Sequence, residues 1–144
     1  MTDNFYDEVL IDHVMHPIHR HELCGECCCS KKGINPSCGD EITLHLEVEN
    51  GIISNGSYTG IGCAVSQASA DIMLDLIIGR KTEEALRLKD LFMKMIKGGI
   101  TDDELEELEE AGALKSIAKM PARVKCAVLG WNTLECMIHE KGQE

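Results

Sequence analysis

The sequence predicts an α+β fold in which a small antiparallel sheet of about three strands carries helices packed on one face. The first observation is the strict alternation of apolar and polar residues over 42–48, which is typical of a half-buried strand. The second is Asn50-Gly51, a strong hairpin signal, after which residues 52–58 return as the partner strand. The third is that apolar residues after Cys63 recur at helical spacing, with glycine or proline at the segment boundaries.

Helices are expected both before the sheet and after it. The first covers residues 4–15, because its apolar side chains have helical spacing and Pro17 ends it. The later helices are expected at 64–78, 82–97, 101–112 and 121–140. The acidic helix among these begins with a capping-box pattern, and the last one has a proline in its first turn. The stretch before Pro36 leaves room for one further edge strand.

Length and composition fit a single folded domain that covers residues 1–144. Hydrophobic residues make up 44% of the chain and charged residues 27%, so the chain is globular rather than disordered. A net charge of −11 repels phosphate backbones and argues against a nucleic-acid partner. No apolar run reaches the length of about 18 residues that a membrane span needs, so no membrane partner is expected.

The eight cysteines are the most informative feature of the composition. The first residues of the chain are acidic and resemble no export signal, so a cytoplasmic location is expected. In that reducing compartment, clustered cysteines indicate metal or thiol chemistry rather than a disulfide framework.

Residues 35–40, Asn-Pro-Ser-Cys-Gly-Asp, predict a tight turn directly before a strand. Gly39 lacks a Cβ, so the backbone can fold until Cys38 and Asp40 converge on one point. A thiolate and a carboxylate are both good zinc donors. Taken alone, Cys-Gly-Asp is weak evidence, because many turns contain these residues by chance.

Cys63 and Cys126 occupy two further special positions. Cys63 lies between a Gly-x-Gly turn and a helix start, where unsatisfied N–H groups and the positive end of the helix dipole favour a thiolate. Cys126 lies one to two turns into the last helix, and the nearby cations Arg123 and Lys125 favour its ionised form. The alternatives are a cysteine packed as a small hydrophobe at 63, and ordinary solvated helix residues at 123 and 125.

Together, Cys38, Asp40, Cys63 and Cys126 supply four donors, the usual number for zinc. Their soft thiolates favour zinc or an iron–sulfur cluster over magnesium or calcium. The ligands carry more negative charge than a divalent metal neutralises, and the nearby Arg123 and Lys125 would offset that excess.

The joined motifs resemble the U-type iron–sulfur cluster assembly proteins, the family of IscU and NifU-like scaffolds. The resemblance spans nearly the whole chain: Asp-His at 12–13 with Pro17, Asn-Pro-x-Cys-Gly-Asp at 35–40, Gly-x-Gly-Cys at 60–63, and Pro-Ala-Arg-x-Lys-Cys at 121–126. The chain is most similar to the SufU branch, because Lys125 stands where the IscU branch carries histidine and a long stretch separates Cys63 from Cys126. Residues 80–120 are then expected to be a helical insertion specific to that branch.

The resemblance implies that zinc is bound by Cys38, Asp40, Cys63 and Cys126. It also implies sulfur transfer from a pyridoxal-phosphate cysteine desulfurase of the SufS type, with Cys38 as the persulfide acceptor once a partner histidine replaces it on zinc. Arg123 is expected to steady the site electrostatically. Downstream iron–sulfur assembly proteins are the implied recipients of the sulfur.

Three functions remain open on these residues. The favoured one is a zinc-dependent sulfur acceptor and carrier, which in enzymatic terms is a sulfurtransferase. One alternative is a scaffold that binds a transient [2Fe–2S] cluster on Cys38, Cys63 and Cys126. The other is a structural zinc domain, but such sites are usually closed Cys/His shells, whereas Asp40 is a harder and more exchangeable ligand. Lys125 in place of histidine favours the carrier over the scaffold.

Several cysteines and histidines lie outside the predicted site. Cys24, Cys27, Cys28 and Cys29 depart from the family pattern; they form either a metal or redox pair, or a flexible segment or edge strand with incidental thiols. His13 and His16 are expected to be solvent-exposed or partner-facing, because no third ligand is evident beside them. Cys136 is expected to be a packing residue.

Overall fold

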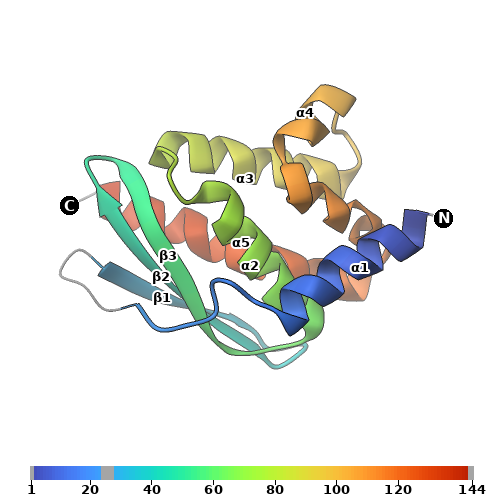
Figure 1. Cartoon of the computed structure of the whole chain (residues 1–144), viewed down its shortest axis with the longest axis horizontal. Coiled ribbons are helices and arrows are strands. Elements are labelled where there is room, and N and C mark those ends of the chain that lie inside the picture. Colours follow the sequence, from blue (N-terminus) through green and yellow to red (C-terminus); the bar gives the residue numbers. More distant parts are fainter. Residues whose placement is uncertain (1, 24–27, 143–144) are drawn as a thin grey trace.

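The computed structural model describes residues 2–23 and 28–142, in which helices pack over one side of a sheet (Figure 1). In chain order the elements are α1 (Thr2–Met15), β1 (Cys28–Asn35), β2 (Asp40–Glu49), β3 (Ile52–Ile61), α2 (Ala64–Ile77), α3 (Thr82–Lys97), α4 (Asp102–Glu107), the 3₁₀ helix η1 (Glu109–Lys119) and α5 (Pro121–Gly142). Within these described residues, no helix is both long and apolar enough to cross a membrane.

The three strands form an antiparallel sheet in the order β1-β2-β3, which confirms the predicted α+β fold. The β2–β3 hairpin turns at Asn50 and Gly51, whose φ angles of 55° and 77° are both positive, as a two-residue type I′ turn requires. β1 is the edge strand for which the sequence left room before Pro36. At its end, Asn35 pairs with Asp40, so the β1–β2 turn lies at the opposite end of the sheet from the hairpin.

β2 alternates between two environments, as its sequence pattern predicts. Ile42, Leu44 and Leu46 are at most 1% exposed, whereas the residues between them are partly exposed. α2 and α5 lie over the buried face of the sheet, and α3 packs beyond them (Figure 1). Trp131 of α5 stacks on Phe92 of α3, with ring centroids 4.3 Å apart. Burial of these apolar side chains is the main free-energy gain that holds the helices on the sheet.

The acidic segment differs from its prediction as one helix at 101–112. The capping box at Thr101 and Glu104 is present, but α4 ends at Glu107 and the 3₁₀ helix η1 follows. The physical reason is visible in the spacing of the apolar residues. Four of the buried side chains recur at every third position, Leu108, Ala111, Leu114 and Ile117, and Ala113 is buried beside them. A 3₁₀ helix has three residues per turn, so it places all four on one face, which an α-helix would not.

Residues 16–21, called the N-terminal strap below, run from α1 along the edge of β3. The carbonyl of His19 accepts a hydrogen bond from the Tyr58 N–H at 2.9 Å. Arg20 forms a parallel bridge with Tyr58, and its Nη2 donates to the Gly60 carbonyl at 3.3 Å. The strap therefore covers the open edge of β3 close to the turn that leads into Cys63.

Two predictions about single residues are wrong. His13 is not solvent-exposed but buried, because it lies between carboxylates of α2 and η1. Cys136 is not a packing residue, because its position on α5 faces solvent. His16 is exposed, as expected. Of the N-terminal cysteines, Cys24 and Cys27 lie outside the described residues, whereas Cys28 and Cys29 begin the edge strand β1. A metal or redox role for that group stays a prediction.

Candidate metal centre

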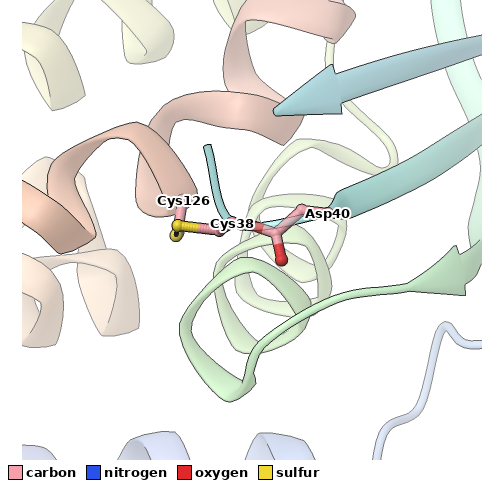
Figure 2. Close-up of side chains that lie close together, drawn as sticks. All are labelled: Cys38, Asp40 and Cys126. Atoms are coloured by element: carbon pink, nitrogen blue, oxygen red, sulfur yellow. Dashed lines mark hydrogen bonds between the residues drawn. The ribbon is translucent and has the colours of Figure 1, made fainter. Parts of the chain in front are cut away.

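Three of the four predicted donors meet at one end of the sheet (Figure 2). Cys38 lies in the β1–β2 turn, Asp40 is the first residue of β2, and Cys126 projects from the second turn of α5. One donor atom from each of these residues lies within 4.8 Å of the other two. Cys38 is exposed, whereas Asp40 and Cys126 are buried. The chain therefore brings two thiols and a carboxylate, 88 residues apart at their extremes, to a single point.

The turn that carries Cys38 depends on Gly39 and Asn35. Gly39 has a φ of 70°, in the left-handed region that glycine adopts without strain. The Cys38 N–H donates to the Asn35 carbonyl at 3.3 Å and closes the turn. The Asn35 side chain in turn donates from Nδ2 to Cys126 Sγ at 3.7 Å. Asn35 thus links the turn to α5, a role that the Asn-Pro pattern contained but that spacing alone did not reveal.

Asp40 is a buried carboxylate with one unsatisfied oxygen. Its Oδ1 accepts the Cys63 N–H at 2.8 Å. Its Oδ2 is buried and has no hydrogen-bond partner within the described residues. Leaving a buried carboxylate oxygen without a donor or cation is costly. Because two thiols lie beside this carboxylate, the donor set fits a thiophilic cation such as zinc.

Cys63 joins the site through its backbone. It is the N-cap residue of α2, and its own N–H holds Asp40. Its thiol lies outside the tight group of Cys38, Asp40 and Cys126, although it interacts with the Cys126 thiol. Burial raises the pKa of the Cys63 thiol, but hydrogen bonds from the Ser66 backbone and from Cys126 lower it, and the net pKa is below the ordinary value for cysteine.

Position 62, directly before Cys63, has no room for a side chain. A Cβ at this position would lie 2.5 Å from Ser66 Oγ, closer than real Cβ contacts, and 3.0 Å from Asp40 Oδ1, tighter than most of them. The backbone before Cys63 therefore packs directly against the carboxylate of Asp40. Ser66 is a second residue that the sequence reasoning missed; its hydroxyl donates to the Cys63 carbonyl at 3.0 Å.

Cys126 is the most deeply buried of the three thiols. It donates to Cys38 Sγ at 3.4 Å. Burial is the largest cause that raises the pKa of the Cys126 thiol well above its ordinary value, and the neighbouring Cys38, Asp40 and Cys63 raise it further. A divalent cation reverses this electrostatic effect, because it stabilises the deprotonated thiol directly.

The predicted cations near the site are exposed. The side chains of Arg123 and Lys125 form no ion pair within the described part of the chain. Arg123 lies in the first turn of α5, three residues before Cys126, so the geometry leaves its charge in solvent beside the site rather than in it. An electrostatic role for Arg123 stays a prediction.

Comparison with known proteins gives a consistent set of relatives. A profile of the NifU-like N-terminal domain matches residues 5–127. The iron–sulfur cluster assembly scaffold protein IscU of Thermotoga maritima is 39% identical over 130 residues, which cover 90% of this chain and 89% of the relative. The zinc-dependent sulfurtransferase SufU of Bacillus subtilis is 35% identical over 133 residues, which cover 92% and 88%.

The fold also matches a solved structure. A protein from Fervidobacterium islandicum AW-1, proposed as an iron–sulfur cluster assembly scaffold for the SUF system, has a TM-score of 0.83 and 32% identity, with 90% of this chain and 93% of that chain covered. The relative called IscU is slightly more identical than the one called SufU, so identity does not assign the chain to the SufU branch.

Proposed function

This chain belongs to the family of NifU-like N-terminal domains, the IscU and SufU proteins of iron–sulfur cluster assembly, and we propose that within this process it accepts and carries persulfide sulfur. The proposed donor is a pyridoxal-phosphate cysteine desulfurase, and the proposed acceptor is Cys38. The observation that carries this proposal is the contrast in exposure at the site. Cys38 is exposed, while its neighbours Asp40 and Cys126 are buried.

This contrast in exposure suggests different roles for the four residues. Asp40 and Cys126 are buried, Cys63 is partly buried, and hydrogen bonds within the site hold all three, so they suit permanent metal ligands. Cys38 lies on a turn at the surface, so a partner's active-site cysteine can approach its sulfur. When bound, zinc would keep the thiol of Cys38 deprotonated at neutral pH and offset part of the negative charge of its ligands.

The transfer step is a thiol–persulfide exchange. The Cys38 thiolate attacks the terminal sulfur of the desulfurase persulfide, and a new S–S bond forms on Cys38. The S–S bond of the donor breaks, and the desulfurase cysteine leaves as a thiolate. Charge and atoms balance without an added oxidant or reductant, because one persulfide is exchanged for another.

Apolar residues on the same segments support a protein partner. Ile34 precedes the Cys38 turn, Ile61 precedes Cys63, and Met120 precedes α5; all three are exposed. Large exposed apolar side chains around a reactive group are typical of an interaction surface. Arg123 lies in the same region, and we assign it the role of an exposed charge that steadies the site and orients the partner.

A second candidate function rests on the convergence of thiols. Cys38 and Cys126 are 3.4 Å apart, and Cys63 interacts with Cys126, so the same residues are candidates to ligate a transient [2Fe–2S] cluster. The carrier and the scaffold differ in bound metal. Protein purified without oxygen should contain one zinc and show no visible absorption if it is a carrier. A brown protein with iron and sulfide would instead favour the scaffold.

The role of Cys38 is tested with a cysteine desulfurase and a measurement of alanine formation. We expect the wild-type protein to stimulate alanine formation strongly and Cys38→Ala to give none of this stimulation. Cys136→Ala is the matched control, because Cys136 is also exposed but lies ten residues beyond Cys126 on α5. Equal stimulation by wild type and Cys38→Ala would rule out Cys38 as the acceptor.

A further inference from the structure

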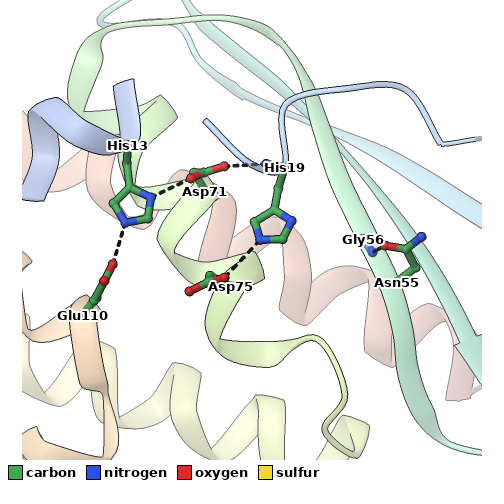
Figure 3. A network of polar contacts seen from close by, with 7 residues as sticks. All are labelled: His13, His19, Asn55, Gly56, Asp71, Asp75 and Glu110. Atoms are coloured by element: carbon green, nitrogen blue, oxygen red, sulfur yellow. Dashed lines mark hydrogen bonds and ion pairs between the residues drawn. The ribbon is translucent and has the colours of Figure 1, made fainter. Parts of the chain in front are cut away.

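His13 of α1 joins three parts of the chain in a cluster away from the metal centre (Figure 3). Its Nδ1 lies 2.6 Å from Asp71 Oδ2 on α2, and its Nε2 lies 2.6 Å from Glu110 Oε2 on η1. His13 is 5% exposed and Asp71 is 0% exposed, whereas the Glu110 side chain is 59% exposed. We call these three residues the His13 cluster.

The geometry requires a charged histidine. A neutral imidazole has one N–H donor and one acceptor nitrogen, but both ring nitrogens of His13 face carboxylate oxygens, which accept only. Both nitrogens must therefore donate, and the ring is an imidazolium. The same two carboxylates raise the pKa of His13 from 6.5 to about 9, the Asp71 hydrogen bond being the largest cause.

Asp71 carries the link from His13 to the sheet. Its other oxygen, Oδ1, accepts the backbone N–H of His19 at 2.9 Å, at the centre of the N-terminal strap. The strap then binds β3 through Tyr58 and Gly60. Gly60 is three residues before Cys63, so these hydrogen bonds, together with the short chain segments 19–20 and 60–63, connect α1 to the backbone of the candidate metal centre.

The charged groups around the cluster leave His13 as the cation of Asp71. From α2, Asp75 faces His19, with 3.4 Å between Asp75 Oδ1 and His19 Nε2. From β3, the phenol of Tyr58 lies near Asp71, and from η1 only Glu110 reaches His13. Within the described residues, Asp71 forms no ion pair other than that with His13. A buried carboxylate that loses its cation is strongly destabilised.

We propose that the imidazolium of His13 holds α1 on α2 reversibly: when it loses its proton, α1 and the N-terminal strap separate from α2 and the turn before Cys63 loosens. A cation that draws Glu110 away weakens the same contact without breaking it, because Asp71 still pairs with His13. The inference concerns the conformation of the chain and does not depend on the proposed function. It also gives Glu110 of η1 a role, because a basic surface that binds Glu110 weakens the hold on α1 from outside.

The first test is the titration of His13 by NMR in the wild-type protein with labelled histidine. We expect its ring signals to titrate near pH 9, well above the ordinary value of 6.5 for histidine. Titration of His13 near 6.5 would overturn the proposal.

The second test is amide hydrogen exchange, corrected for intrinsic rates, at several pH values between 6.5 and 10. In wild type, exchange in α1 and the strap should accelerate as pH rises through about 9. In His13→Gln it should be about a hundredfold faster at pH 6.5 and independent of pH, while His16→Gln behaves as wild type. If the amides of α1 were as well protected from exchange in His13→Gln as in wild type, the proposed role of His13 would be contradicted.

A milder variant covers the case in which His13→Gln does not fold. Glu110→Gln changes an exposed side chain, so the fold should persist. We expect about threefold faster exchange in α1 and the strap and a lower His13 titration midpoint. Glu106→Gln on α4 removes the same charge from an exposed position and should change neither. If the amide of Cys63 exchanges at the wild-type rate while α1 is released, the link to the metal centre is disproved.

Discussion

Two buried aspartates in the described part of the chain, Asp40 and Asp71, have opposite environments. Asp71 has its own cation: His13 binds one oxygen and the backbone N–H of His19 binds the other. Asp40 has one backbone donor, from Cys63, and a second oxygen with no partner within the described residues. Both side chains are 0% exposed.

The comparison distinguishes a carboxylate that holds the fold together from one that can serve as a metal ligand. A fully paired buried carboxylate fixes the position of neighbouring elements and needs nothing further. A half-satisfied carboxylate beside two thiols, Cys38 and Cys126, has its charge balanced only when a cation binds. Burial alone does not separate the two cases; the count of satisfied oxygens does.

Asparagine at each position gives the sharpest test of this contrast. Asp71→Asn should lower the free energy of unfolding by about 3 kcal/mol, because the imidazolium of His13 loses its buried partner. Asp40→Asn should leave the metal-free protein within about 1 kcal/mol of wild type, because it removes an uncompensated charge. Urea unfolding in the presence of a chelator measures both.

Zinc competition completes that experiment. Asp40→Asn should weaken zinc binding by at least about tenfold, whereas Asp71→Asn should leave zinc affinity close to wild type in the folded protein. If Asp40→Asn were the more destabilised variant without metal, the two environments would have been assigned the wrong way round.

Alkaline pH should weaken the Asp71 side of the comparison through His13. The pKa of His13 is about 9 in the folded protein against an ordinary value of 6.5, so folding binds a proton. The stabilisation is therefore complete below pH 6.5 and is lost as pH rises through 9. We expect a loss of about 2 kcal/mol, reduced from the full linkage value because water screens Glu110. Urea unfolding of the metal-free protein at pH 6.5, 8 and 9.5 should show this loss in wild type and a flatter dependence in His13→Gln.

Gly62 offers a smaller perturbation of the Asp40 side. Gly62→Ala places a Cβ against Ser66 and Asp40 and should cost about 1–2 kcal/mol of stability. Because the shift moves the Asp40 carboxylate, zinc affinity should also fall, by about tenfold. Gly99→Ala is the control, since a Cβ there would have its nearest neighbour at 3.9 Å. Equal zinc affinity in the two variants would remove Asp40 from the ligand set.

Much of the fold could be predicted from local patterns. The alternation at 42–48 and the Asn50-Gly51 turn depend on neighbouring residues only, and both match the structure. The split of the acidic segment could not be predicted from its caps. It follows from the three-residue period of buried side chains, and which of them are buried depends on packing against α1, α2 and α3.

The candidate metal centre also combines features that are local in the sequence with contacts that are not. The turn at Cys38 and Asp40 and the helix start at Cys63 are local features, so their residue types indicated metal chemistry. That Cys126 meets Cys38 depends on how α5 crosses the sheet, and only the family resemblance joined them beforehand. The prediction that His13 is exposed is wrong for a related reason. Its partners Asp71 and Glu110 are 58 and 97 residues away, beyond any local pattern.

The central claim is that Cys38, Asp40, Cys63 and Cys126 bind one zinc ion, and X-ray absorption at the zinc edge of the anaerobically purified protein tests it most directly. The account predicts three sulfur ligands at about 2.3 Å and one oxygen ligand at about 2.0 Å. Asp40→Asn should alter the oxygen shell and leave the three sulfurs in place. A shell of four sulfurs, a shell with histidine nitrogen, or a folded protein that binds no zinc would contradict it.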